Sequence, residues 1–322
     1  MPRYEHCGLR IADCGLPTAD CGLPLLKWAG GKRQLLPQLR RFYPDAFDAY
    51  IEPFFGSGAV FFDLHAQGRL RDRDVLLVDS NSDLIGCYEA VRSSPDEVAR
   101  ALDGLAAGHA RGERAHYYRV RDERFNPLRN RLRQKDGRIA YTPELAAMLI
   151  YLNRTGFNGL FRVNARGAFN VPPGRYERPS IADRDKLSRA AEALSGPRVR
   201  LLCGSFESVR DLAKRGDFVY CDPPYAPLSR TSNFTSYTAP RFDQADQRTL
   251  QELVVALAHR GCRVLVSNST ADAIAALYER DRTAQAAGLR TLRIRARRAI
   301  NSNAARRGPV DEFLITNIAA PG

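Results

Sequence analysis

The chain has no long apolar run, because no stretch approaches the roughly 18 uninterrupted apolar residues of a membrane-spanning helix. The N-terminus also lacks a basic region followed by an apolar run, the pattern of a secretory signal. We therefore expect a cytoplasmic protein. Its 322 residues, 44% of them hydrophobic, are enough for one large domain or two modest ones.

Cysteine and histidine patterns for metal binding are also missing. No CxxC pair occurs and the five histidines are dispersed, which argues against a structural zinc site or a disulfide framework. The clustered acids of a metal-dependent nuclease are absent. Three of the seven cysteines belong to a seven-residue CGL repeat between Cys7 and Lys27. We expect no metal, and a repetitive, disordered tail over residues 1–24.

Lysine is scarce, and most of the positive charge comes from arginine. Only five of the 49 basic residues are lysine, yet the net charge is +13. Such a surplus suggests a polyanionic partner, most often nucleic acid, although an arginine bias also arises from genomic coding. Between Arg111 and Arg138 the chain has ten basic residues against four acidic ones, so the charge is concentrated in one region.

Apolar runs alternate with helix-like segments on both sides of that basic region. Continuous apolar runs predict buried strands, and helices are predicted between them, among them 94–108 with a Ser94 cap and 206–216. Two segments near the C-terminus, 289–298 and 310–316, look like a closing antiparallel pair. The alternation predicts an α/β fold with a mostly parallel sheet, interrupted by a mainly helical insertion.

The segment "YIEPFFGSGAVFF" (residues 50–62) predicts a strand that ends in a glycine turn and opens a helix. Glycines let the backbone approach a ligand at a helix N-terminus. The next predicted strand ends at Asp79, where nucleotide-binding folds place an acid that bonds ribose hydroxyls. Because the G-x-G-x-x-G pattern is not met, S-adenosylmethionine (AdoMet) fits better than NAD. The alternative is an acid that only caps the following helix.

The segment "DPPY" follows another predicted strand. A planar amino group on a base becomes more nucleophilic when acceptors hold both of its N–H bonds. Asp222 offers one acceptor and the carbonyl of Pro223 the other, while Pro223 and Pro224 restrict the backbone and Tyr225 offers a stacking face. We interpret this set as a clamp for an exocyclic amine; the alternative is an ordinary proline turn.

Two further stretches have less specific patterns. "NRTGFNGLFRVNARGAFNVPPGRY" (residues 153–176) is a long loop with arginine and asparagine, which read base edges, and with Phe157, which could wedge between bases. A solvated loop is the alternative. "LKWAGGKRQLLPQL" (residues 26–39) places the only tryptophan, Trp28, beside two glycines and Lys32.

Together these stretches resemble the Dam-type (D12 class) DNA adenine-N6 methyltransferases. The matching segments include "KWAGGK", "EPFFGSG", "VDSNSDLI", the loop of residues 153–176, "YCDPPYAPLSRTSNFTSY" and "SNS", in the family's order, from about residue 25 to near the C-terminus. The resemblance implies an AdoMet-dependent, Rossmann-like catalytic domain over 25–93 and 179–322, with a DNA target-recognition domain over 94–178. It implies binding to duplex DNA, and we expect a monomer because the reading and catalytic groups belong to one chain.

The resemblance also implies roles for individual residues. Trp28, Lys32, Phe54, Gly56, Gly58, Asp79 and Asp222 would bind AdoMet, and Asp222, Pro223, Pro224 and Tyr225 would hold a flipped adenine. The DNA-binding residues would be Lys27, Arg154, Phe157, Asn158, Leu160, Arg162, Pro172, Tyr176, Asn233 and Tyr237. Among these, Lys27 and Arg162 would read guanines, Leu160 a thymine methyl, Pro172 the recognised bases, and Arg154 a flanking phosphate. The expected target is GATC.

Other functions remain open at this point. Cytosine-N4 methylation of DNA and adenine-N6 methylation of RNA use related chemistry, although the acid-first "DPPY" and the long loop favour adenine in DNA. A non-catalytic DNA-binding relative is the alternative from another functional class. Degenerate motifs would mark such a protein, whereas Trp28, Asp79 and Asp222 to Tyr225 are all present here.

Overall fold

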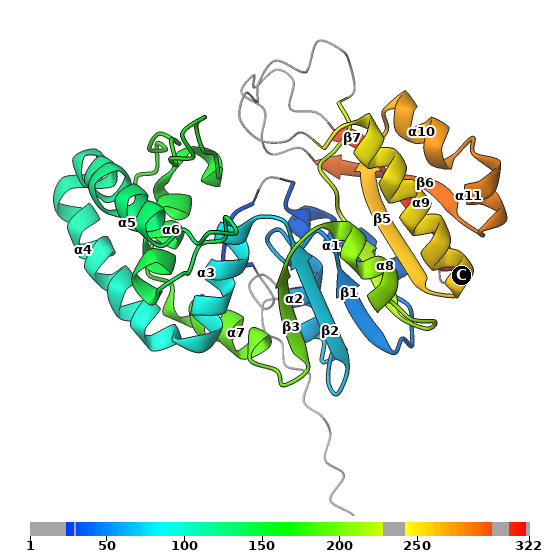
Figure 1. The fold of residues 1–322 in the computed structure, drawn as a ribbon, viewed down its shortest axis with the longest axis horizontal. Helices are drawn as coiled ribbons and strands as arrows, with labels where there is room; N and C mark the ends of the chain where they lie inside the picture. The colour runs from blue at the N-terminus through cyan, green and yellow to red at the C-terminus, as the bar shows by residue number, and fades with distance from the viewer. Residues whose placement is uncertain (1–23, 29, 228–241, 298–308, 320–322) are drawn as a thin grey trace, which may run out of the picture.

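A computed structural model describes residues 24–28, 30–227, 242–297 and 309–319. Within these residues a seven-stranded sheet has the order β3-β2-β1-β4-β5-β7-β6 (Figure 1). The strands from β3 to β5 are parallel, and β7 pairs antiparallel with both β5 and β6. The strand bounds are β1 Ala49–Glu52, β2 Asp74–Asp79, β3 Val199–Cys203, β4 Phe218–Cys221, β5 Arg263–Ser269, β6 Arg290–Arg297 and β7 Pro309–Thr316. The predicted α/β fold and its closing antiparallel pair are confirmed.

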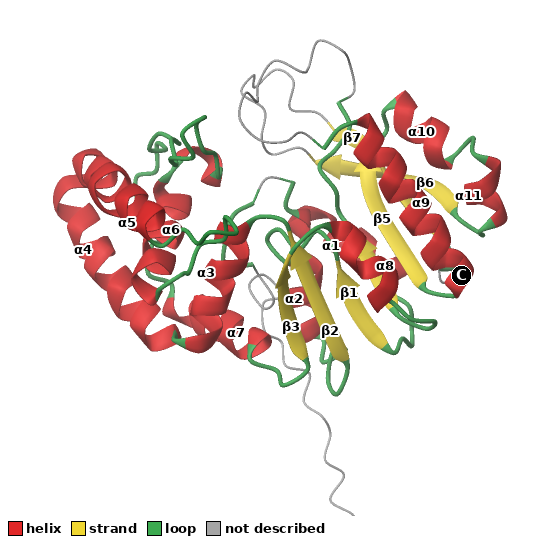
Figure 2. Ribbon diagram, viewed as in Figure 1, coloured by secondary structure: helices red, strands yellow, loops and turns green. Residues whose placement is uncertain are grey.

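Helices cover both faces of the sheet, and every strand except β6 contributes to two cores (Figure 2). In β2, Val75 and Leu77 belong to one core, and Leu76 and Val78 belong to the other, as the two-residue period of a strand requires. Strands buried on both faces need continuous apolar runs, which is the pattern in the sequence. The first core includes α1 Leu36–Leu39, α2 Ala59–Ala66, α3 Ser82–Ser93 and α7 Arg184–Leu194; the second includes α8 Val209–Leu212, α9 Gln244–Arg260, α10 Asp272–Tyr278 and α11 Arg282–Ala286.

A group of helices extends beyond the β3 edge of the sheet (Figure 1). It consists of α4 Pro95–Tyr118, a π-helical segment Arg119–Phe125, α5 Asn126–Arg131 and α6 Pro143–Thr155. The first core continues without a break from Leu77 in the sheet to Leu152 in α6. A buried ion pair also joins the two parts, since Arg129 Nε lies 2.5 Å from Asp83 Oδ1 on α3. The helical character predicted for this region is confirmed, whereas the domain boundaries at 94 and 178 stay a prediction.

The first of these helices is longer than its predicted span of 94–108. Leu105 and Tyr117 are both buried and α4 packs along α6, so the apolar contact continues past Gly108. A glycine inside a helix costs only about 1 kcal/mol, which this packing outweighs. The Ser94 side chain makes no capping hydrogen bond, contrary to the prediction.

The helix predicted over 206–216 is shorter than expected. Only a 3-10 turn, Phe206–Ser208, and the four residues of α8 are helical. The Asp217 carboxylate accepts a hydrogen bond from the Lys214 backbone amide at 2.7 Å, and this contact fixes the turn into β4 instead of a further helical turn. Among the described residues, no helix has the length and apolarity needed to cross a membrane.

The turn between β1 and α2 depends on Gly58. Its φ of +69° is left-handed, and a Cβ atom at this position would lie 2.4 Å from the ring of Phe55. The Phe55 ring packs on Phe61, Phe62 and Tyr88 in the core, so it cannot move away freely. Glycine is therefore required here by backbone angle and by space.

We predict that Gly58→Ala lowers the free energy of unfolding by about 1–2 kcal/mol for the left-handed backbone, plus about 1–3 kcal/mol for overpacking. Gly68→Ala is the matched control, because Gly68 also has φ +69° but has no atom within 4 Å of the added Cβ. It should show only the first loss. Urea unfolding of both variants measures the difference, and equal losses would show that Phe55 imposes no steric limit.

Candidate active site

The candidate site lies where the strand order reverses, at the carboxyl ends of β1 and β4. The strand β1 has β2 on one side and β4 on the other, so the connections leaving β1 and β4 diverge (Figure 1). Open α/β sheets bind ligands in the crevice that such a divergence creates. The segment after β1 contains the glycine turn of residues 54–58, and the segment after β4 contains Asp222–Tyr225.

Asp79, at the end of β2, is fixed by the glycine turn. Its Oδ2 accepts a hydrogen bond from the Gly56 amide at 2.9 Å, and its Oδ1 accepts one from the Asn81 amide at 2.9 Å. Burial raises the pKa of Asp79 above its ordinary value, and these two amides partly offset that rise. The carboxylate is therefore held at the crevice by the backbone, as a ribose-binding acid needs to be.

Trp28 lies against this turn. A Cβ atom on Gly56 would lie 3.3 Å from Trp28 Cδ1, and the Gly31 amide donates to the Trp28 carbonyl at 3.1 Å. The other neighbour of the indole is Phe161, whose ring stacks on it with centroids 5.7 Å apart. Trp28 thus connects the glycine turn to the long loop that contains Phe161.

Three phenylalanines form an aromatic group at the same edge of the sheet. The ring of Phe54 stacks on that of Phe206 with centroids 5.2 Å apart, and Phe242 packs on both at 5.6 Å. The sequence indicated only Phe54. Phe206 follows β3 at the same carboxyl edge, and its position after a predicted strand is the signal that could have identified it.

Asp222 forms an ion pair that closes the site. Lys32 Nζ lies 2.7 Å from Asp222 Oδ1, donates to the Gly30 carbonyl at 2.7 Å, and lies 4.5 Å above the Tyr225 ring. Burial raises the pKa of Asp222 to about 6; Lys32 counteracts that rise, and the charge of Glu312 adds to it. Lys32 is only 4% exposed and Asp222 is 18% exposed, so the two charges are largely shielded from water.

The catalytic segment, residues 222–226, has no regular secondary structure, and side chains from two elements, α9 and β5, hold its carbonyl groups. Gln247 on α9 donates to the Pro224 carbonyl at 2.9 Å, and Asn268 on β5 donates to Gln247 at 3.0 Å. Ser269 donates to the Ala226 carbonyl at 2.7 Å. The sequence reasoning did not identify Gln247, because its contact spans 23 residues and depends on how α9 packs.

Within the predicted reading loop, residues 153–176, the first three residues are the end of α6, and the remainder is a hairpin-like structure and not an irregular coil. Isolated bridges join Gly156 to Pro173 and Val163 to Phe169, and the Phe157 amide donates to the Pro172 carbonyl at 2.9 Å. Phe157 and Tyr176 are 46% and 37% exposed. Several other predicted DNA-binding residues are also exposed on this loop, namely Asn158, Arg162 and Pro172, while Leu160 is half-buried.

Lys27 joins the exposed set although it lies 126 residues before the loop. Its backbone amide donates to Asn153 Oδ1 at 2.8 Å, and Asn153 Nδ2 donates to the carbonyls of Lys27 and Gly159. The Lys27 ammonium lies 4.4 Å above the ring of Tyr176. Asn153 is therefore a supporting residue of the loop, for which the sequence had indicated no separate role.

Arg154 lies apart from the exposed set. It is 9% exposed, and its Nη2 donates to the Leu25 carbonyl at 2.5 Å, so the guanidinium points into the protein. A phosphate contact would require this side chain to turn outward, and that role stays a prediction. Asn233 and Tyr237, with residues 1–23 of the tail, lie outside the described residues.

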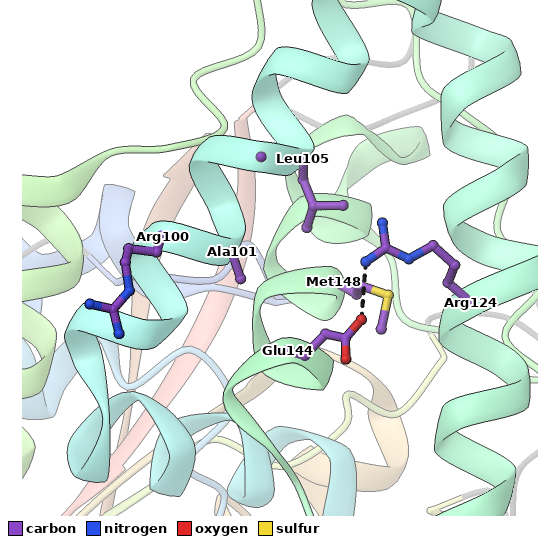
Figure 3. A pocket seen from close by; sticks show the side chains of 7 residues that line it. Arg100, Ala101, Leu105, Arg124, Glu144 and Met148 are labelled. Carbon is purple, nitrogen blue, oxygen red and sulfur yellow. Dashed lines mark hydrogen bonds and ion pairs between the residues drawn. The ribbon is translucent and has the colours of Figure 1, made fainter.

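A separate cavity of about 310 Å³ lies among α4, the π-helical segment and α6 (Figure 3). Its lining includes Arg100, Leu105 and Met148, and an ion pair of 3.0 Å between Arg124 and Glu144. None of the site residues described above lines it. Within the described residues, no group of three or more His, Cys, Asp or Glu side chains is arranged to hold a metal ion.

Comparisons with known proteins agree with this geometry. Residues 28–297 match the family model described as D12 class N6 adenine-specific DNA methyltransferase. The chain is 36% identical over 293 residues to the Type II methyltransferase M1.LlaDCHI of Lactococcus lactis subsp. cremoris, covering 90% of this chain and 94% of that protein. It is 37% identical over 303 residues to the Type II methyltransferase M.MjaIII of Methanocaldococcus jannaschii, covering 91% and 98%. It is 36% identical over 289 residues to the DNA adenine methylase of Escherichia coli K12, covering 90% and 93%.

The chain belongs to the D12 class N6 adenine-specific DNA methyltransferases. It is an enzyme that transfers a methyl group from a donor to the N6 atom of adenine in DNA, as the resemblance implied. The family favours this function over cytosine-N4 methylation, RNA methylation and a non-catalytic role.

If Asp222 holds the target amine, we predict that the rate of methyl transfer falls below about pH 6, because the ionised carboxylate is the stronger acceptor and the form that can stabilise a positive charge on N6. In Lys32→Met the midpoint of the pH–rate profile should move to a higher pH, since the cation that lowers the pKa of Asp222 is gone. Single-turnover rates against pH, at saturating methyl donor, measure both midpoints.

Lys214→Met is the control, because Lys214 is exposed and belongs to the turn before β4, at the amino end of that strand and away from the candidate site. Its profile should match that of the unmodified enzyme. An unchanged midpoint in Lys32→Met would contradict the assignment of the acid limb to the Asp222–Lys32 pair.

Proposed function

We propose that the enzyme takes its methyl group from AdoMet and transfers it to the adenine of GATC in duplex DNA, after that base has rotated out of the helix. The observation that carries the proposal is the Asp222–Lys32 pair beside Tyr225, at the crevice between β1 and β4. An acceptor, a cation and an aromatic face lie together there. Base rotation is needed because the N6 atom cannot be reached inside the stack.

The residues of the crevice fit AdoMet. Asp79 supplies a fixed carboxylate for the ribose hydroxyls, and the aromatic group of Phe54, Phe206 and Phe242 supplies apolar faces for an adenine ring. The glycine turn leaves room for close approach, since a Cβ atom on Gly56 would already contact Trp28. When bound, AdoMet supplies a methyl group activated by a sulfonium sulfur.

The catalytic segment would hold the target amine. The Asp222 carboxylate and the Pro223 carbonyl accept the two N6–H bonds, and Tyr225 stacks on the base. These contacts draw the nitrogen towards tetrahedral geometry, so that its lone pair points at the methyl carbon. As the new C–N bond forms, the bond between the methyl carbon and the sulfonium sulfur would break and a neutral thioether would leave. The nitrogen would become positively charged, Asp222 would stabilise that charge, and N6 would afterwards lose a proton to water. Orientation and electrostatics therefore provide most of the catalysis.

Lys32 has two tasks in this proposal. Before the base arrives, it keeps the Asp222 carboxylate ionised in a site from which water is largely excluded. Because it also lies 4.5 Å above the Tyr225 ring, it has to shift when the base stacks there.

Sequence recognition is assigned to the reading loop and Lys27. Arg162 Nε donates to Asn170 Oδ1 at 2.8 Å, which orients the guanidinium on an exposed surface. Arginine bonds the O6 and N7 atoms of guanine through two nitrogens. Phe157, the most exposed large apolar side chain of the described residues, would fill the space left by the extruded base. Lys27, Leu160 and Pro172 complete the set from which GATC is proposed.

The wider organisation follows from the same assignments. Residues 94–178 are proposed as the DNA-recognition domain, and the chain is proposed to act as a monomer because reading and catalytic groups belong to one chain. Its basic surplus would bind phosphates with a strong salt dependence. A cytoplasmic location would give the enzyme access to DNA.

The test is methyl transfer from labelled AdoMet to a duplex with one GATC site, beside a duplex with that site scrambled, followed by digestion to nucleosides. We expect N6-methyladenine only in the GATC duplex. Asp222→Ala should lower the rate by at least about 10²–10³-fold while DNA affinity is unchanged, because Asp222 lies apart from the exposed reading loop.

Three results would contradict parts of the proposal. Equal label in both duplexes would remove Lys27 and Arg162 from recognition of GATC. Ordinary turnover by Asp222→Ala would exclude the clamp. No label in either duplex would overturn the proposed target.

We further predict that Arg162→Ala relaxes discrimination at one guanine of the site by about 1–3 kcal/mol. Rates on duplexes that carry each single substitution of the site measure this change. Arg166→Ala is the matched control, because Arg166 is exposed on the turn of the same loop. Arg166→Ala should lower the rate on all duplexes by the same factor. If Arg162 contacts only phosphate, Arg162→Ala should also lower all the rates equally, and the assignment to guanine would be wrong.

A further inference from the structure

Glu312 on β7 is a buried acid that no sequence motif indicated. It is 8% exposed and pairs with Ser269 of β5 on one side and with Ile294 of β6 on the other. Its carboxylate points to the catalytic segment, since the hydroxyl of Tyr225 donates to Glu312 Oε2 at 2.6 Å. The contact spans 87 residues and joins the antiparallel part of the sheet to the site.

The catalytic segment needs such a contact. Proline rings fix φ at Pro223 and Pro224, and Gln247 and Ser269 hold the carbonyls of Pro224 and Ala226. None of these contacts sets the direction of the Tyr225 ring. The hydroxyl bond to Glu312 is the polar contact of that side chain among the described residues, and a hydrogen bond to a carboxylate is stronger than a neutral one.

Glu312 is also the first of four side chains that contact one another in turn across the site. Glu312 bonds Tyr225, the ring of Tyr225 faces the Lys32 ammonium at 4.5 Å, and Lys32 pairs with Asp222 at 2.7 Å. The negative charge of Glu312 is close enough to oppose ionisation of Asp222. A change at Glu312 is therefore expected to reach both the stacking ring and the accepting carboxylate.

We propose that Glu312 is a positioning residue for methyl transfer, which acts through the hydroxyl of Tyr225 to fix the ring on which the target adenine stacks. This inference rests on the proposed role of Tyr225. Glu312 itself touches neither the base nor the methyl donor. The competing explanation is that Glu312 only stabilises the edge of the sheet, in which case its effect does not depend on the Tyr225 hydroxyl.

A double-mutant cycle on the full chain separates the two explanations. Tyr225→Phe keeps the ring and removes only the hydroxyl, and Glu312→Asp keeps the charge but withdraws the carboxylate by one methylene. Each should lower the single-turnover rate on a GATC duplex by about tenfold. The double variant should also be about tenfold slower and not a hundredfold slower, because both changes break the same bond.

Two further variants serve as references. Glu312→Gln keeps an acceptor oxygen, so its rate should stay within about threefold of the unmodified enzyme. The acid side of its pH–rate profile should move to a lower pH, because the charge that opposes ionisation of Asp222 is removed. Asp311→Asn is the matched control on the same strand, since Asp311 is exposed and its side chain points away from Glu312. Its rate and pH profile should be unchanged. Thermal unfolding checks that each variant is folded.

A second readout follows the base directly. With 2-aminopurine in place of the target adenine, stacking on Tyr225 quenches the fluorescence of the extruded base. Glu312→Asp and Tyr225→Phe should raise that fluorescence equally, and Asp311→Asn should leave it unchanged. If the wild type is active but the double variant is about a hundredfold slower, the two substitutions act independently. That result would overturn this inference and leave the proposed function intact. A wild-type chain that transfers no methyl group to the GATC duplex would overturn the proposed function and this inference with it.

Discussion

The site depends on the ion pair between Lys32 and Asp222. Burial disfavours the charge of Asp222, and without a cation at 2.7 Å the carboxyl would take up a proton at a still higher pH and lose the negative charge that the proposed mechanism needs. Each charge is the main compensation for the other. Removing one partner of a buried pair typically costs about 3–5 kcal/mol, so the pair also constrains the chain around it. The fold satisfies the constraint by bringing the segment after β4 against the N-terminal segment that contains Lys32.

That N-terminal segment, residues 25–32, connects the three functional parts of the molecule. Lys27 bonds Asn153 of the reading loop, Trp28 lies between the glycine turn and Phe161, and Lys32 pairs with Asp222. Three residues of this segment therefore contact the reading loop, the glycine turn and the catalytic segment. A displacement of this segment when DNA binds would move residues at the reading loop, the glycine turn and the catalytic segment together. Recognition of the DNA sequence would in this way be coupled directly to the position of Asp222.

Much of the fold and part of the site could be predicted from the sequence, for reasons that differ between elements. Strands buried on both faces need continuous apolar runs, so β2 and β4 were evident, and Asp79 and Asp222 follow directly from where those strands end. The contact between Glu312 and Tyr225 could not be predicted, because it depends on the order of strands in the sheet. The inward direction of Arg154 was also hidden, since a sequence gives the position of a side chain in the chain but not the carbonyl that it will bond.

The most direct test of this account is the structure of the enzyme with a GATC duplex and an unreactive AdoMet analogue. We expect the target adenine to lie outside the duplex, with N6 at about 2.7–3.2 Å from an Asp222 oxygen and from the Pro223 carbonyl oxygen, and with Lys32 displaced from above the Tyr225 ring. An adenine that is extruded but bound elsewhere, with the Lys32–Asp222 pair and the Tyr225 ring unchanged, would contradict it.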